Sequence, residues 1–164
     1  MKNLLLILII AVPGIIYAKN IDLIELNYEW YIHNYKYIEK TLIDGKDKKV
    51  VPIVNTLGQI WIKRDGAIGA EVSPYIAKAL IFQTKTMLIW FSANSKGFSE
   101  WVSNIEANLL TDYSGVRLAE IKKLRSDLLS SLNKYITNET DNELGRMAKI
   151  ILTKLESSEV REID

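Results

Sequence analysis

The sequence predicts an all-α fold, a compact bundle of about seven helices around a single core. Apolar residues recur at every third or fourth position through most of the chain, which is the period of an amphipathic helix. Short polar stretches, several of them containing glycine, separate the periodic segments. Hydrophobic residues make up 48% and charged residues 25% of the 164 residues, so the chain carries enough apolar side chains for one buried core.

The first 18 residues differ from the rest and predict a signal peptide. Lys2 provides a positive start, residues 4–12 are all apolar, and a proline and a glycine break the run before Ala18, a usable peptidase site. The apolar run is about 14 residues long, shorter than the roughly 20 that a helix needs to cross a bilayer. We therefore expect residues 1–18 to be cleaved and residues 19–164 to form a single soluble domain, periplasmic or secreted, without stable membrane insertion.

The composition limits the chemistry that the chain can perform. It contains no cysteine and one histidine, His33. Disulfides and thiolate nucleophiles are therefore excluded, and too few nitrogen ligands remain for the usual zinc sites. The sequence contains no phosphate-binding loop, dinucleotide fingerprint or nucleophile elbow. We expect neither a metal nor a cofactor, and we assign no catalytic residue.

The charge pattern argues against nucleic acid as a partner. The 21 basic and 20 acidic residues nearly cancel, which leaves a formal charge of +1. The basic runs at residues 46–49 and 122–125 are short, and acidic residues such as Asp47, Glu120 and Asp127 interrupt or flank them. Neither run predicts the basic face that phosphate binding requires, and both are interpreted as solvated surface.

The clearest predicted helix spans residues 21–43. Asp22 and Glu25 have capping-box spacing at its start, and Asp44 and Gly45 offer a stop. One row of apolar residues repeats at spacings of three and four, and a second row widens the stripe beyond that of a two-stranded coiled coil. We therefore place this helix in a multi-helix core. The first row is Ile21, Ile24, Tyr28, Tyr31, Tyr35, Ile38 and Leu42, and the second is Leu23, Leu26, Trp30 and Tyr37.

Residues 50–63 allow two interpretations. Pro52 suits the first turn of a helix that follows a polar loop at residues 45–49. The alternative is a β-hairpin with its turn at residues 55–58, because both halves of the segment are rich in β-branched side chains. We favour the helix, whose buried face would carry Val54, Leu57, Ile60 and Trp61.

Capping signals place the next helices. Ser73, which is followed by a proline, is expected to cap one helix, and Thr84 to cap a short helix directly after it. An amphipathic helix over residues 98–109 comes next. A long helix capped by Ser114 follows, with apolar residues on one face and charged residues on the other. Trp61, Trp90 and Trp101 are in phase with apolar neighbours and are expected in the core.

The C-terminal region is predicted to hold one more helix. Thr140 and Glu143 have capping-box spacing before it, and residues 157–164 are polar and expected to be frayed. Several short antiparallel pairs along the chain suggest a HEAT-like stack of helical pairs as an alternative. No internal repeat of roughly 40 to 47 residues supports that arrangement. The buried face of the last helix would carry Leu144, Met147, Ile151 and Leu155.

Aromatic residues gather on the first predicted helix and are the candidate binding residues. They are Tyr28, Trp30, Tyr31, Tyr35 and Tyr37. They cannot all share one face of a helix, so some should be exposed, and exposed aromatic side chains mark binding surfaces. The alternative is that these tyrosines occupy their ordinary place at the core boundary with hydroxyls in water. His33, one turn after Glu29, joins the candidate set, although a partly exposed histidine needs no function.

These features favour a binding or inhibitor protein of the envelope, immunity-like and without catalysis, whose partner is another envelope protein. Export, helical character and the lack of catalytic motifs motivate this hypothesis. One alternative is a small envelope enzyme that uses paired carboxylates, for example on glycans, since Glu25, Glu29, Glu39, Asp65 and Glu71 could meet in space. Another is a structural role as an oligomer subunit, which would require a self-complementary apolar patch.

Overall fold

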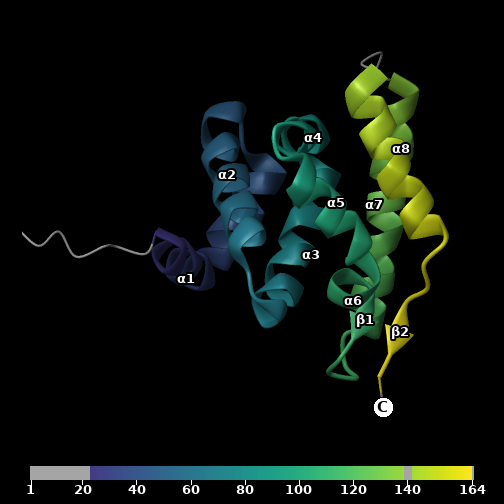
Figure 1. Ribbon diagram of the computed structural model, residues 1–164, viewed down its shortest axis with the longest axis horizontal. Coiled ribbons are helices and arrows are strands. Elements are labelled where there is room, and N and C mark those ends of the chain that lie inside the picture. The colour runs from purple at the N-terminus through teal and green to yellow at the C-terminus, as the bar shows by residue number, and fades with distance from the viewer. Residues whose placement is uncertain (1–22, 139–141, 164) are drawn as a thin grey trace, which may run out of the picture.

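The computed structural model describes residues 23–138 and 142–163, and it confirms the all-α bundle. Within these residues the chain forms eight helices and two short strands (Figure 1). The predicted signal peptide, residues 1–18, and Thr140 of the predicted capping box lie outside the described residues. No described helix combines the length and the apolar character needed to cross a membrane. The helices are α1 (Leu23–Asp44), α2 (Asp47–Lys63), α3 (Gly66–Phe82), α4 (Thr84–Ser92), α5 (Ser95–Ser103), α6 (Ile105–Leu109), α7 (Leu118–Asn138) and α8 (Asn142–Glu156).

The helices pack around α3, which contacts α1, α2, α4, α6 and α7. Figure 1 shows α1 at one end of the molecule and the α7–α8 pair at the other. One hydrophobic core runs through the described residues, from Tyr31 on α1 to Leu155 on α8. Trp61 and Trp101 are fully buried and Trp90 is nearly so, which confirms the expectation for these three side chains.

The segment that allowed two interpretations is helix α2, so the hairpin alternative is wrong. Its buried positions follow the helical period, and Val51, Asn55 and Gln59 between them are exposed. The helix begins at Asp47, well before Pro52, so residues 47–49 belong to it and the loop is shorter than predicted. The buried residues are Val50, Ile53, Val54, Leu57, Ile60 and Trp61.

Helix α3 also begins earlier than predicted, because Asp65 supplies its cap. The Asp65 carboxylate accepts the backbone N–H of Ile68 at 3.0 Å. Ser73 therefore lies inside α3 and is not a cap. It is 1% exposed, and its hydroxyl accepts the indole N–H of Trp101 at 3.0 Å. The hydroxyl that the sequence suggested for capping is used to satisfy a buried tryptophan.

Two other local predictions need correction. Thr84 does not cap α4, since its hydroxyl donates to the Leu80 carbonyl at 2.7 Å at the end of α3. The helix predicted over residues 98–109 is interrupted at Asn104, which separates α5 from α6.

The start of α7 is held by Asp112 in place of the predicted Ser114. The buried Asp112 carboxylate accepts backbone N–H groups from Ser114 at 2.9 Å, Gly115 at 3.1 Å and Arg117 at 2.6 Å. Burial by itself would raise the pKa of Asp112, but these bonds and the Ser114 hydroxyl outweigh it and lower the pKa. Gly115 has a φ of 69°, a value suited to glycine, which lets the chain turn into the helix.

The C-terminal tail is ordered against the bundle, contrary to the predicted fraying. Strands β1 (Thr111–Asp112) and β2 (Arg161–Glu162) pair in parallel. Ser158 is 2% exposed, and its hydroxyl donates to the Glu106 carboxylate at 2.9 Å. The tail was predicted to fray because it is polar, but its polar groups pair with α6 and β1.

Candidate functional site

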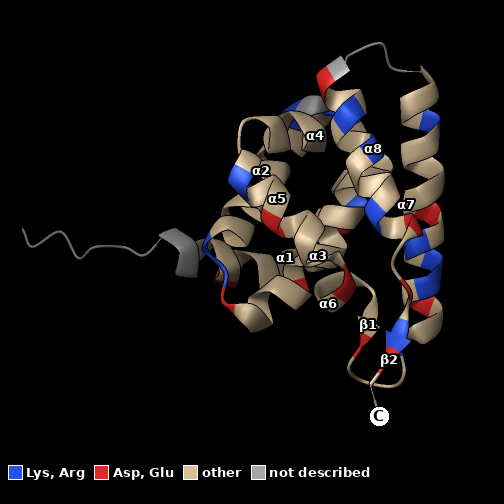
Figure 2. Cartoon of the chain, turned by 45° about the vertical axis from the view of Figure 1, so that its right-hand side comes forward, with Lys and Arg blue, Asp and Glu red and all other residues tan. Residues whose placement is uncertain are grey.

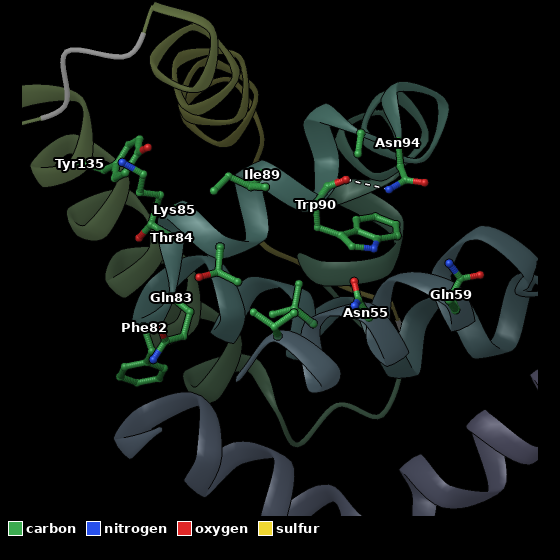
Figure 3. A pocket seen from close by; sticks show the side chains of 14 residues that line it. Asn55, Gln59, Phe82, Gln83, Thr84, Lys85, Ile89, Trp90, Asn94 and Tyr135 are labelled. Atoms are coloured by element: carbon green, nitrogen blue, oxygen red, sulfur yellow. Dashed lines mark hydrogen bonds between the residues drawn. The ribbon is translucent and has the colours of Figure 1, made fainter. Parts of the chain in front are cut away.

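A groove of about 940 Å³ lies between α2 and α4 (Figure 3). The end of α3 and one residue of α7 border it. We call it the α2–α4 groove. Its lining consists of Val51, Val54, Asn55, Gln59, Phe82, Gln83, Thr84, Lys85, Thr86, Ile89, Trp90, Ala93, Asn94 and Tyr135.

The base of the groove is formed where α4 crosses α2 with the Trp90 ring between them. A Cβ atom on Gly58 would lie 2.2 Å from two atoms of this ring. Only glycine allows the α2 backbone to approach the ring so closely. The side-chain amide of Asn94 donates to the Trp90 carbonyl at 2.8 Å, which ties the last turn of α4 to the loop that follows it (Figure 3). The base of the groove is therefore closely packed.

Apolar side chains stand exposed around this base. Val51 is 44% exposed, Phe82 45% and Ile89 51%. They come from three different helices and line one concavity, so together they form more than scattered surface residues. Apolar surface gathered in a concave site is typical of places where another molecule binds.

Two uncommitted amides lie on the α2 wall of the groove. Asn55 and Gln59 are exposed, one helical turn apart, and no hydrogen bond joins either side chain to another described residue. Gln83 differs, because its amide donates to the Leu42 carbonyl at 2.8 Å and so holds the start of α4 against the end of α1. Each free amide offers a donor and an acceptor to a ligand.

The aromatic residues proposed from the sequence divide into two groups, and the first group is structural. Tyr31 is 4% exposed, and its hydroxyl donates to the Glu71 carbonyl at 2.8 Å. Tyr28 stacks on Tyr31 with ring centroids 6.0 Å apart, and its hydroxyl donates to the Glu71 carboxylate at 2.5 Å. This bond to a carboxylate raises the pKa of Tyr28 to about 12. Both tyrosines fasten α1 to α3.

The second group faces away from the core. Trp30, Tyr35 and Tyr37 are 37%, 46% and 51% exposed. Trp30 and Tyr37 contact each other edge to face, with centroids 6.4 Å apart. His33 is also exposed, and its Nε2 lies 3.7 Å from the Glu29 carboxylate. The structure thus does not bring the six predicted residues together into one site.

The carboxylates considered for acid–base chemistry have other partners. Asp65 caps α3, and Glu71 accepts the Tyr28 hydroxyl. Glu39 accepts the Lys78 ammonium at 2.8 Å, and Glu29 faces His33. The side chain of Glu25 lies outside the described part. No observation on the described residues therefore favours an enzyme that uses two of these carboxylates as an acid–base pair.

The resolved pKa shifts of carboxyl groups point the same way. A glycosidase acid needs a carboxyl group whose pKa is raised. Hydrogen bonds from Lys154 and Ser158 lower the pKa of Glu106, and the Arg117 guanidinium lowers that of Glu120. Asp112 is lowered as well. In the described residues every resolved carboxyl shift favours the ionised form.

Neither a metal site nor a known relative points to a function for the described residues. Within residues 23–138 and 142–163, no three His, Asp or Glu side chains gather in a way that could hold a metal ion. No protein-family model, curated protein or solved structure matches the chain. The geometry of the groove and of the exposed surfaces is therefore the basis for proposing a function.

Proposed function

We propose that the chain is a non-catalytic binding protein of the cell envelope, and that an extended segment of a partner protein docks in the α2–α4 groove. The observation that carries the proposal is the pair of amides, Asn55 and Gln59, which bond to no other described residue and lie beside exposed apolar side chains on a closely packed base. The N-terminal sequence, residues 1–18, supports the envelope location, because it has the pattern of a signal peptide.

The spacing of the amides favours an extended occupant. Residues four apart on a helix are separated by a rise of about 6 Å. Two residues of an extended chain span roughly 6.6 to 6.8 Å. Asn55 and Gln59 can therefore each pair with the backbone of alternate residues of one extended segment, because a side-chain amide presents the same donor and acceptor as a peptide group.

The rest of the lining supports a neutral, partly apolar segment. Lys85 is the only charged residue among the lining residues, and no carboxylate is present there. Side chains between the paired peptide groups would contact Val51, Phe82 and Ile89, which are now half exposed. Removing this apolar surface from water supplies the affinity, and the amides supply register and direction.

Site-specific crosslinking in the native envelope tests the proposal. A photo-crosslinking phenylalanine derivative is placed at Gln59 in the groove and, as a control, at the exposed Lys122 on α7. We expect a covalent adduct with one envelope protein from position 59 only. The crosslinked segment is identified by mass spectrometry and synthesised as a peptide, and its affinity for the purified protein is measured by calorimetry.

Two substitutions of equal exposure sharpen the test. Ile89→Glu places a charge in the groove, whereas Ile150→Glu places one on α8, and the two isoleucines are 51% and 49% exposed. Ile89→Glu should weaken the peptide at least tenfold, or about 1.4 kcal/mol, and Ile150→Glu should leave its affinity unchanged. Equal affinities for the two variants, or an adduct only with a second copy of this chain, would contradict the proposal.

A further inference from the structure

A second concave surface, separate from the α2–α4 groove, lies at the turn between α1 and α2. It encloses about 620 Å³, and Lys40, Lys46, Lys48 and Lys49 line it together. We call these four residues the lysine cluster. In the described residues none of the four ammonium groups pairs with a carboxylate.

Some other lysines of the described residues lie in ion pairs. Lys78 pairs with Glu39 at 2.8 Å, and Lys123 pairs with Asp127 at 2.5 Å. Both basic and acidic residues lie along α7 (Figure 2). Residues 40–49, by contrast, hold four lysines and two aspartates, Asp44 and Asp47, in a chain whose total charge is +1. Asp44 lines the same concavity as the lysines. The cluster is therefore a local excess of positive charge, and among the described side chains no carboxylate forms an ion pair with it.

Exposed aromatic residues continue this surface. Tyr37 lines the same concavity, and its ring contacts that of Trp30 along the outer face of α1. Both rings are exposed, so each leaves a large apolar area in contact with water. Tryptophan and tyrosine with an apolar body and a polar edge suit the boundary between lipid headgroups and acyl chains, and lysines beside them suit lipid phosphates.

We propose that the lysine cluster and the Trp30–Tyr37 pair dock on the anionic surface of a phospholipid bilayer. The ammonium groups donate to lipid phosphates, and the two rings enter the headgroup region. The proposed contact is peripheral and reversible, because it uses exposed side chains at the headgroup level. It leaves the α2–α4 groove free, so it neither requires the proposed protein partner nor excludes it.

Vesicle sedimentation tests whether binding depends on the negative charge of the lipid. The full chain is expressed with its own N-terminal sequence and purified. Its intact mass shows whether residues 1–18 are present in the protein that is tested. Vesicles of phosphatidylcholine alone are compared with vesicles that contain one part in three of phosphatidylglycerol. We expect binding to the anionic vesicles only, and its loss when salt rises from about 0.1 M to about 1 M and the Debye length falls from about 10 Å to about 3 Å.

Charge-matched variants locate the surface. Replacing Lys46, Lys48 and Lys49 by glutamine should weaken the partition roughly 100-fold, about fivefold for each lysine. The control replaces an equal number of exposed lysines on α7 and α8 by glutamine and should change it less than threefold. Circular dichroism confirms that both variants are folded. The control residues are Lys122, Lys134 and Lys149.

Tryptophan fluorescence reports the aromatic contact directly. Trp61 and Trp101 are fully buried and Trp90 is 7% exposed, which leaves Trp30 as the tryptophan that responds to a surface ligand. Anionic vesicles should shift the emission to shorter wavelength, and Trp30→Phe should remove the shift.

Four results would overturn the proposal. They are equal binding to neutral and anionic vesicles, equal losses for the two lysine variants, a Trp30 emission unchanged in bound protein, and binding of a DNA oligonucleotide in preference to vesicles at the same salt.

Discussion

Substituting Gly58 by alanine tests the contact that forms the base of the α2–α4 groove. The new Cβ would lie 2.2 Å from Cε2 and Cζ2 of Trp90 and 2.7 Å from Cη2. Carbon atoms in ordinary contact are about 3.5 to 4.0 Å apart, so the ring and α2 must separate by more than about 1 Å. Because Trp90 is only 7% exposed, its ring cannot rotate into solvent without uncovering the core.

The sign of the effect follows from two opposing terms. Alanine favours a helix interior over glycine by roughly 0.5 to 1 kcal/mol. Overpacking a rigid core costs typically about 1 to 3 kcal/mol, and this contact is among the closest possible. We expect Gly58→Ala to lower the free energy of unfolding by about 1 to 2 kcal/mol. Gly145 in α8 has no heavy atom within 4 Å of the corresponding position, so Gly145→Ala should raise it by about 0.5 to 1 kcal/mol.

Urea denaturation followed by circular dichroism at 222 nm measures both variants under one set of conditions. A double-mutant cycle with Trp90→Leu then tests the cause. Removing the ring should make Gly58→Ala less destabilising by at least about 0.5 kcal/mol, because the two residues are in contact. If Gly58→Ala stabilises the protein as Gly145→Ala does, or if the cycle shows additive effects, the close crossing of α2 and α4 is wrong.

Three further outcomes are expected. Ser73→Ala leaves the buried indole N–H of Trp101 without an acceptor and should cost about 1 to 3 kcal/mol in urea unfolding; the loss should shrink when Trp101 is also changed to phenylalanine. The raised pKa of Tyr28 means that its bond to Glu71 stabilises the fold fully below pH 10 and that this contribution is lost as the pH rises toward 12. The melting temperature of Tyr28→Phe should therefore depend less on pH between these values than that of the unchanged protein. The lowered pKa of Asp112 has the opposite consequence. The ionised carboxylate stabilises the fold fully above the ordinary aspartate pKa, and this stabilisation is lost as the pH falls through the lowered pKa. In Asp112→Asn the melting temperature should therefore fall less steeply on acidification.

Much of the helical architecture can be read from the sequence, because burial in a helix leaves a periodic trace in the chain itself. On α1, Tyr31, Ile38 and Leu42 are buried as their spacing predicts, whereas Tyr35 in the same row is 46% exposed. The burial of Trp61 and Trp101 follows from the same argument. A side chain that shares a helix face with apolar neighbours is buried with them when that face packs on the core.

The ends of the helices were predicted less well, for a different reason. Ser73, Thr84 and Ser114 all have the chemistry of caps, but their hydroxyls bond to other groups in the folded chain or lie beside a stronger acceptor, Asp112. A short polar side chain serves a cap, a turn or a buried donor equally well. Which role it takes depends on neighbours that are distant in sequence.

The candidate site depends still more on tertiary structure. The amides of Asn55 and Gln59 are recognisable in the sequence as a pair one turn apart, but nothing local shows that Ile89 will lie across from them. That juxtaposition needs α4 to cross α2, which the missing side chain of Gly58 permits. Likewise, Tyr28 and Tyr31 are structural only because α3 brings Glu71 against them.

The amino-acid sequence by itself determined the helical class, the stripes that are buried and the absence of thiol chemistry, since each depends on residue type and local spacing. The tertiary structure alone decided which tyrosines are anchored, which lysines are left without a counter-charge and where a groove opens. Those properties depend on the relative placement of helices, which is set by the packing of the whole core and not by any one segment.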